Sequence, residues 1–225
     1  MNIKCLYSFN NCHDFSIFTN FIEISNWRIE KQLLKERVEK YEFIDSFQKF
    51  KQRFYAQKLS IWDLKLEEVI TWHDTLLIMR RTIKEISKSE VNLDKLKIIM
   101  EYPLIYGNHM RTDYLIIYER LIIVLEFGMF NQDEKRSEER YTKKLQDSIT
   151  HRQVLRNMID SQVKVVNYVL VYRPEYDRFK KTSIDANIEY NYQEINLLSR
   201  FILTHLLEQE ELGAVNQLEM INIYK

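Results

Sequence analysis

Apolar residues along the chain follow the spacing of strands in its middle third. Two short apolar runs, Tyr114–Tyr118 and Leu121–Leu125, flank the dipeptide Glu119-Arg120. Each run has the length and composition of a buried strand, and so short a link between them predicts a β-hairpin. Because Glu-Arg fits the primed turns poorly, the sequence leaves the turn type open.

A two-residue link also fixes the register of this hairpin. Tyr118 would face Leu121, and the same register continued outward places Asp113 opposite Glu126. Side chains opposed on one face of a sheet lie roughly 4.5–5.5 Å apart at Cβ, where like charges repel. A Mg²⁺ ion would explain two carboxylates there, since it is commonly held by one or two carboxylates with water and substrate phosphate. The competing interpretation is that both acids simply mark strand ends, where the chain meets water.

Further patterns predict an α/β fold in which helices flank a mixed sheet. Helical spacing of apolar residues is found in Leu66–Ile86, Glu139–Ile159 and Glu194–Glu208, and strand-like runs in Leu96–Ile105 and Val163–Tyr172. A strand, a helix and another strand in succession form a crossover, which would place the last strand parallel to an earlier one. Irregular structure is expected for Asn131–Glu138 and Tyr176–Tyr192, and a short strand or helix for Val215–Tyr224.

The N-terminal region is rich in aromatic residues with helical spacing. A short helix is expected over Asp14–Ile22, with Asp14 as its N-cap. Positions i, i+4, i+7 and i+11 of a second helix would form one buried stripe: Phe43, Phe47, Phe50 and Phe54. We therefore expect a helical N-terminal extension, residues 1–60, packed on a core of residues 61–225 that ends in helices. The aromatic surface of this extension is also a candidate oligomer interface.

Composition narrows the function classes. The net charge is +0, with 33 basic and 33 acidic residues, so binding of nucleic acid would need a local basic patch. Two cysteines near one end form neither a disulfide framework nor a zinc site. The chain has 3 glycines, too few and too scattered for a phosphate-binding loop, and its 5 histidines lack metal-ligand spacing. No apolar run approaches a membrane span, and the N-terminus is too polar for a secretory signal, so we expect a cytoplasmic protein.

The hairpin and its neighbours resemble the PD-(D/E)XK nuclease superfamily. The segment RTDYLIIYERLIIVLEF, residues 111–127, is similar to the second and third strands of that core. Together with Glu68–Trp72 and Glu101–Pro103, it also resembles the nuclease-like N-terminal region of uncharacterised bacterial helicases. The resemblance covers about residues 60–175. It implies a restriction-endonuclease-like core, in which helices flank a mixed central sheet.

The resemblance also implies an activity and a set of roles. The reaction would be hydrolysis of phosphodiester bonds in DNA or RNA with Mg²⁺ or Mn²⁺, which Asp113 and Glu126 would ligate. Glu68 would be an outer acid that ligates the metal or a water. The alternative is that Glu68 only interacts favourably with the helix dipole, as acids near the start of a helix do. Gln146 would orient substrate or metal-bound water. Because the chain has no motor motif, a helicase or other protein subunit is an expected partner beside nucleic acid.

One departure from the superfamily pattern concerns the lysine two residues after the second acid. That position is Gly128 here, whereas a lysine would position or deprotonate the attacking water. One interpretation is that another cation fills the space, and the candidates are Lys135, Lys143 and Lys144. The other is that catalysis has been lost, and that the domain binds nucleic acid or a partner protein. The sequence leaves both open.

Overall fold

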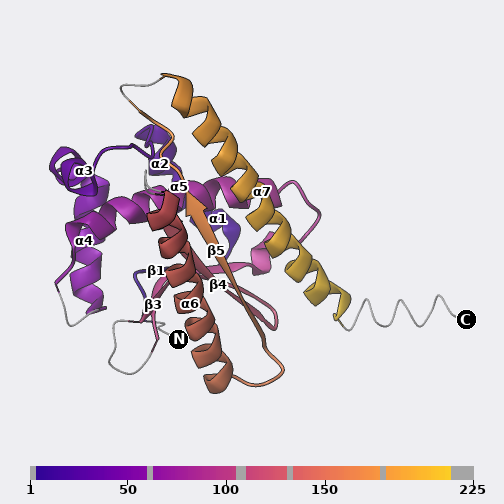
Figure 1. Ribbon diagram of the computed structural model, residues 1–225. Coiled ribbons are helices and arrows are strands. Elements are labelled where there is room, and N and C mark those ends of the chain that lie inside the picture. Colours follow the sequence, from indigo (N-terminus) through magenta and orange to yellow (C-terminus); the bar gives the residue numbers. More distant parts are fainter. Residues whose placement is uncertain (1–3, 60–62, 105–109, 131–133, 178–180, 214–225) are drawn as a thin grey trace, which may run out of the picture.

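The computed structural model describes residues 4–59, 63–104, 110–130, 134–177 and 181–213, with the backbone alone for 134–137 and 181–184. A five-stranded sheet of order β1-β2-β3-β4-β5 runs through the molecule (Figure 1). The strands are β1 (Tyr7–Phe9), β2 (Lys97–Pro103), β3 (Arg111–Tyr118), β4 (Leu121–Met129) and β5 (Lys164–Tyr172). Neighbours from β1 to β4 are antiparallel, and β5 is parallel to β4, which confirms the predicted mixed sheet and crossover.

Seven α-helices surround the sheet in the described part of the chain. They are α1 (Cys12–Phe18), α2 (Asn20–Ile24), α3 (Leu34–Tyr41), α4 (Asp45–Gln57), α5 (Leu66–Ile86), α6 (Glu134–Met158) and α7 (Lys181–Glu211). A short 3₁₀ turn, Leu93–Lys95, precedes β2. None of the helices described is both long enough and apolar enough to cross a membrane.

The two faces of the sheet carry different helices because side chains alternate along each strand. Tyr114, Ile116 and Tyr118 of β3 belong to a large hydrophobic cluster with α5, α7 and the N-terminal helices. Leu115 instead joins a smaller cluster with Leu155 of α6. Figure 1 shows α6 lying across this second face. The side chain two residues before Leu115, which is that of Asp113, therefore points toward α6.

The hairpin register is confirmed. Tyr118 pairs with Leu121 and Tyr114 with Leu125, so Glu119 and Arg120 form the link. Glu119 has φ of 49°, in the left-handed region that a primed turn requires although residues with a Cβ rarely adopt it. Its carboxylate accepts a hydrogen bond of 2.8 Å from Lys95, which ties the hairpin turn to the 3₁₀ turn before β2.

The N-terminal region differs from the expectation in three ways. Its β1 strand pairs with β2, so the region is part of the sheet and not only a helical extension. The first helix is capped by Asn11, whose side chain accepts from the backbone N–H of Asp14 at 2.7 Å, so Asp14 is not the N-cap. Phe43 is 82% exposed because α4 begins only at Asp45, so the buried stripe lacks its first member.

The segments expected to be irregular are partly helical. Helix α6 already begins at Glu134 and α7 at Lys181. A tertiary contact holds the early part of α7 in place: the Asn191 side chain accepts from the backbone N–H of Arg173 at 2.7 Å and donates to its carbonyl at 2.8 Å. Local sequence does not reveal such a contact. The expected final element, Val215–Tyr224, lies outside the described residues.

A buried ion pair joins the N-terminal helices to α5. Arg37 donates to both carboxylate oxygens of Asp74 at 2.7 Å, and Trp27 donates to the same carboxylate at 2.8 Å. Both charged side chains are 0% exposed, so each compensates for the desolvation of the other. Next to this pair on α5, His73 contacts the Val69 carbonyl at 2.7 Å through Nδ1 and the Ser46 hydroxyl at 2.9 Å through Nε2.

The environment of His73 predicts loss of stability in acid. Burial lowers the pKa of His73 to about 4. As pH falls below 6.5, the unfolded chain binds a proton at this histidine and the folded chain does not, so stability should drop by up to about 3 kcal/mol by pH 4. Urea unfolding between pH 7 and 4 should show a flatter dependence for His73→Gln. Equal slopes for both proteins would contradict this prediction.

Candidate functional site

Two acids on neighbouring central strands lie face to face. Asp113 on β3 and Glu126 on β4 follow the pair Tyr114–Leu125 in the hairpin register. Both point toward α6, and Asp113 Oδ2 accepts a hydrogen bond of 2.7 Å from the backbone N–H of Phe127, the residue after Glu126. The exposed fraction of Glu126 is 1%. The hairpin thus holds two carboxylates close together on one face, one of them buried.

A lysine from α6 bridges the two acids. Lys144 Nζ donates to Asp113 Oδ2 at 3.0 Å and to Glu126 Oε2 at 2.9 Å. Burial by itself lowers the pKa of Lys144, but the charges of Asp113 and Glu126 outweigh it, and the pKa is raised above its ordinary value. The ammonium group is therefore charged at neutral pH, and its positive charge offsets the repulsion between the carboxylates.

A histidine supports Glu126 from the same helix. His151 lies seven residues after Lys144, which is about two helical turns and so the same face. Its Nδ1 lies 2.9 Å from Glu126 Oε1, and the ring is buried. Burial and the charge of Asp113 raise the pKa of Glu126, whereas the hydrogen bonds from His151 and Lys144 oppose that shift. The sequence interpretation missed His151, although its seven-residue spacing from Lys144 was a usable signal.

Glu68, the expected outer acid, belongs to a neighbouring ion-pair cluster. Arg111, two residues before Asp113 on β3, contacts Glu68 at 2.5 Å and Glu101 of β2 at 2.8 Å. Trp72 of α5 donates to Glu101 at 2.8 Å. Glu68 is therefore joined to the strands through an arginine, and among the described contacts it has none with Asp113 or Glu126.

Glu101 is a third acid near the pair and is buried like Glu126, and the sequence interpretation gave it no role. Its φ of 54° is left-handed, and it has no partner in the ladder, where Met100 pairs with Tyr114 and Tyr102 with Thr112. This break turns the Glu101 side chain toward α5. Burial raises the pKa of Glu101, and the charges of Asp113 and Glu68 add to the shift, while Arg111 opposes it.

The space beside Gly128 is covered by an arginine that the sequence did not suggest. A Cβ on Gly128 would lie 3.4 Å from Val171 and 3.8 Å from the aliphatic part of Arg140 on α6. Arg140 also donates to the Met129 carbonyl at 2.9 Å. Arg140 thus covers Gly128. Lys144, which lies one helical turn after Arg140 on α6, is the candidate lysine that reaches Asp113 and Glu126.

The remaining candidates do not join the acids. Lys143 is exposed, and the side chain of Lys135 lies outside the described residues. Gln146 does not lie beside the acids, contrary to the expectation. It is exposed, and at two residues from Lys144 it points about 200° away around the helix. Its side chain faces solvent because the face of α6 that packs on the sheet is the one with Lys144 and His151.

The carboxylates of Asp113 and Glu126 suit a hard cation that takes only some of its ligands from the protein. No group of three or more His, Cys, Asp or Glu side chains arranged to hold a metal occurs within the described ranges. Two carboxylates with water and phosphate completing the shell is nevertheless a common mode for Mg²⁺. Asp113 and Glu126 fit this mode, with the condition that the ion would share both carboxylates with the Lys144 ammonium.

Comparisons with protein-family models, curated proteins and solved structures find no match for this chain.

Replacing Lys144 should destabilise the folded protein in a pH-dependent way. Lys144→Met leaves two adjacent carboxylates without their cation, which for this partly exposed site should cost about 2 kcal/mol near pH 7. This loss of unfolding free energy should be smaller near pH 5. The pKa of Glu126 is already raised by burial, and it rises further without Lys144, so that the acid takes up a proton and the repulsion between the two acids decreases. Urea unfolding at both pH values measures this.

Lys143→Met is the matched control for this change, since Lys143 is exposed on the same helix. It should unfold like the wild type at both pH values. Identical unfolding of the two methionine variants would show that Lys144 does not compensate for the acids.

Proposed function

We propose that this protein is a metal-dependent nuclease-like protein that hydrolyses phosphodiester bonds of DNA or RNA. Asp113 and Glu126 would ligate Mg²⁺ or Mn²⁺, and Lys144 would supply the cation that the chain lacks at Gly128. The observation that carries the proposal is the double contact of Lys144 with both acids, at 3.0 and 2.9 Å. A lysine beside two hairpin carboxylates is the combination that the superfamily pattern requires, here with the lysine on the following helix.

The order of elements supports the same proposal. A helix, three antiparallel strands, a second helix and a parallel strand follow one another as α5, β2, β3, β4, α6 and β5. This order fits a restriction-endonuclease-like core of the PD-(D/E)XK superfamily, with the acids on its two hairpin strands. Since fold alone does not imply function, the side chains at the site carry the argument.

Each side chain would have a defined part in the reaction. A metal ion bound by the two acids would activate a water and polarise the scissile phosphate. The Lys144 ammonium, charged at neutral pH, would act on phosphate oxygens through its charge and not as a base. His151 would fix the orientation of Glu126 through its 2.9 Å contact. Arg111 would hold Glu68 and Glu101 beside the site and contribute a second positive charge.

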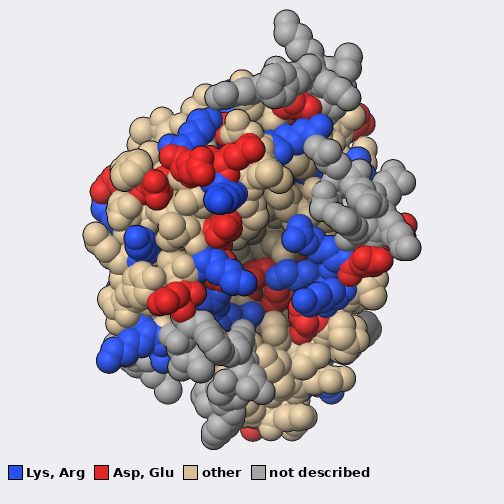
Figure 2. Space-filling view, turned by 60° about the vertical axis from the view of Figure 1, so that its left-hand side comes forward, with Lys and Arg blue, Asp and Glu red and all other residues tan. Residues whose placement is uncertain are grey.

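The distribution of surface charge is compatible with a polyanionic substrate. Although the net charge is +0, Figure 2 shows a hollow near the middle of one face that contains acidic side chains and is bordered by Lys and Arg. Basic borders of this kind attract phosphate, while the acids between them would need a cation before phosphate could approach.

The second candidate function is a module without catalytic activity that binds nucleic acid or a protein subunit such as a helicase. The observation that favours it is the ion-pair arrangement itself: the single Lys144 ammonium contacts both acids, at 3.0 and 2.9 Å, and so offsets part of their charge. In that case the acids and the lysine would have a structural role, and a metal would not be needed.

Cleavage assays distinguish the two functions. Linear, circular and single-stranded DNA and RNA should be cleaved with Mg²⁺ or Mn²⁺ and not with EDTA. Asp113→Asn, Glu126→Gln and Lys144→Met should each lower the rate by about 100-fold or more, since each removes a charge that acts on the reacting phosphate. The measurement is the initial rate on the preferred substrate.

Gln146→Ala and Lys143→Met are the controls, because both side chains are exposed away from the acids. They should keep the wild-type rate. Absence of cleavage on every substrate with either metal, while nucleic acid or a protein partner still binds, would support the second candidate instead.

A further inference from the structure

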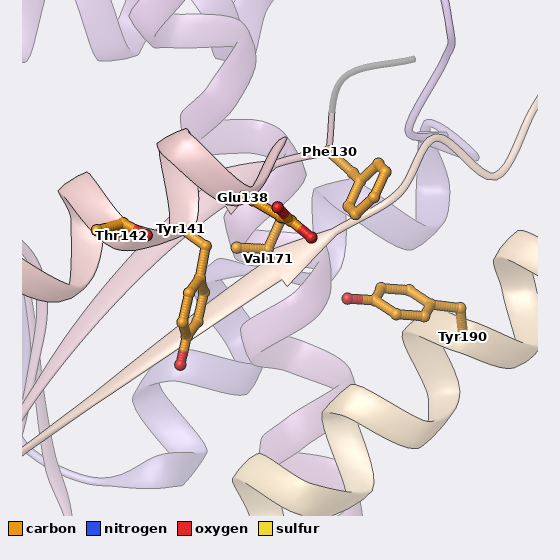
Figure 3. A pocket seen from close by; sticks show the side chains of 6 residues that line it. All are labelled: Phe130, Glu138, Tyr141, Thr142, Val171 and Tyr190. Carbon is orange, nitrogen blue, oxygen red and sulfur yellow. The ribbon is translucent and has the colours of Figure 1, made fainter. Parts of the chain in front are cut away.

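A pocket lies beside the acid pair on the same side of the sheet. It has a volume of about 430 Å³ and is formed by residues of α6, α7 and the end of β5, and by Phe130, which directly follows β4 (Figure 3). Its lining consists of Phe130, Glu138, Tyr141, Thr142, Val171 and Tyr190. The volume falls within the range of small-molecule sites, and three of the six residues are aromatic.

Two relationships connect the pocket to the acids. Val171 of its wall pairs with Gly128, which is two residues beyond Glu126 and therefore about 7 Å along the same strand face. Tyr141 precedes Lys144 by three residues, so the two side chains are neighbours on the surface of α6. A nucleic-acid strand whose phosphate lay at Asp113 and Glu126 would therefore place an adjacent base within reach of the pocket.

The walls suit a flat, aromatic, partly polar group. The rings of Phe130 and Tyr190 lie on the guanidinium of Arg173, with centroids 4.4 and 3.9 Å away, so the aromatic wall is held in place and carries a positive charge. Tyr141 is 44% exposed, so part of its side chain is open to a ligand. In Figure 3 the carboxylate of Glu138 points into the space between Phe130 and Tyr190.

Nucleobases match these features. Aromatic side chains stack on bases of any sequence, and a carboxylate accepts hydrogen bonds from an exocyclic amino group such as cytosine N4. A base within a duplex already has its faces stacked and its amino group paired, so only an unpaired base can enter such a pocket without the energy cost of unstacking.

We propose that this pocket binds an unpaired nucleobase of the strand that is cleaved, so that the substrate class is single-stranded nucleic acid or a single-stranded end. This inference rests on the proposed function for the direction of the strand toward Asp113 and Glu126. Glu138 makes an amino-bearing base the preferred occupant over thymine or uracil.

Binding without metal tests the pocket separately from cleavage. Fluorescence polarisation in EDTA would compare fluorescein-labelled dodecamers of deoxycytidine and deoxythymidine with a duplex of the same length, at neutral pH. The wild type should bind the single strands more tightly than the duplex. Tyr141→Ala should weaken single-strand binding about 10-fold, the loss expected for one base–aromatic stack.

Tyr192→Ala is the matched control, because Tyr192 is also an exposed tyrosine of this region, at 54%, but does not line the pocket. It should bind like the wild type. Glu138→Ala should remove the preference for deoxycytidine over deoxythymidine. A series of oligonucleotides, each with an abasic site at a different position, extends this test. One of these abasic sites should weaken binding to the wild type, and the same site should not weaken binding to Tyr141→Ala.

The outcomes separate the two proposals. Equal effects of Tyr141→Ala and Tyr192→Ala, or tighter binding of duplex than of single strands, would overturn the pocket assignment even if cleavage is observed. Single-strand binding that depends on Tyr141 and Glu138 would support the pocket even if no substrate is cleaved, in which case only the nuclease proposal would fall.

Discussion

The repulsion between two carboxylates on one face of a hairpin is the constraint on which the site depends. Asp113 and Glu126 lie one residue beyond the last pair of the hairpin ladder and both contact Lys144, and Glu126 is almost fully removed from water. Such a pair is unfavourable without a cation. Lys144 provides one in the structure, and its position on α6 couples the packing of that helix to the charge state of the sheet.

This constraint explains several neighbouring features. Helix α6 lies across one face of the sheet, and its side chains at about two-turn spacing, Lys144 and His151, both reach Glu126. The same helix covers Gly128 with the aliphatic part of Arg140 and contributes Tyr141 to the aromatic pocket. One helix thus supplies the cation, the histidine and part of a pocket, while the hairpin supplies the acids.

The sequence was sufficient for features that depend on local pattern. Alternation of apolar residues and a two-residue link defined the hairpin register, whose last pair, Tyr114–Leu125, lies one residue before Asp113 and Glu126. Features that depend on tertiary packing were not accessible. Lys143 and Lys144 are adjacent lysines that the sequence alone does not distinguish. Only the orientation of α6 on the sheet decides which one contacts the acids. The same orientation excludes Gln146 and brings in His151. Similarly, the pairing of β1 with β2 and the exposure of Phe43 depend on contacts between distant segments.

A crystal structure of the protein soaked with Mn²⁺ would show whether the two acids hold a metal, because anomalous scattering locates the ion independently of any reaction. We expect one ion ligated by both Asp113 and Glu126, with Lys144 moved from its bridging position but still beside the carboxylates. Crystals that contain no ion at the acids, with Lys144 still bonded to both, would contradict it and leave the acid–lysine cluster as a structural ion pair.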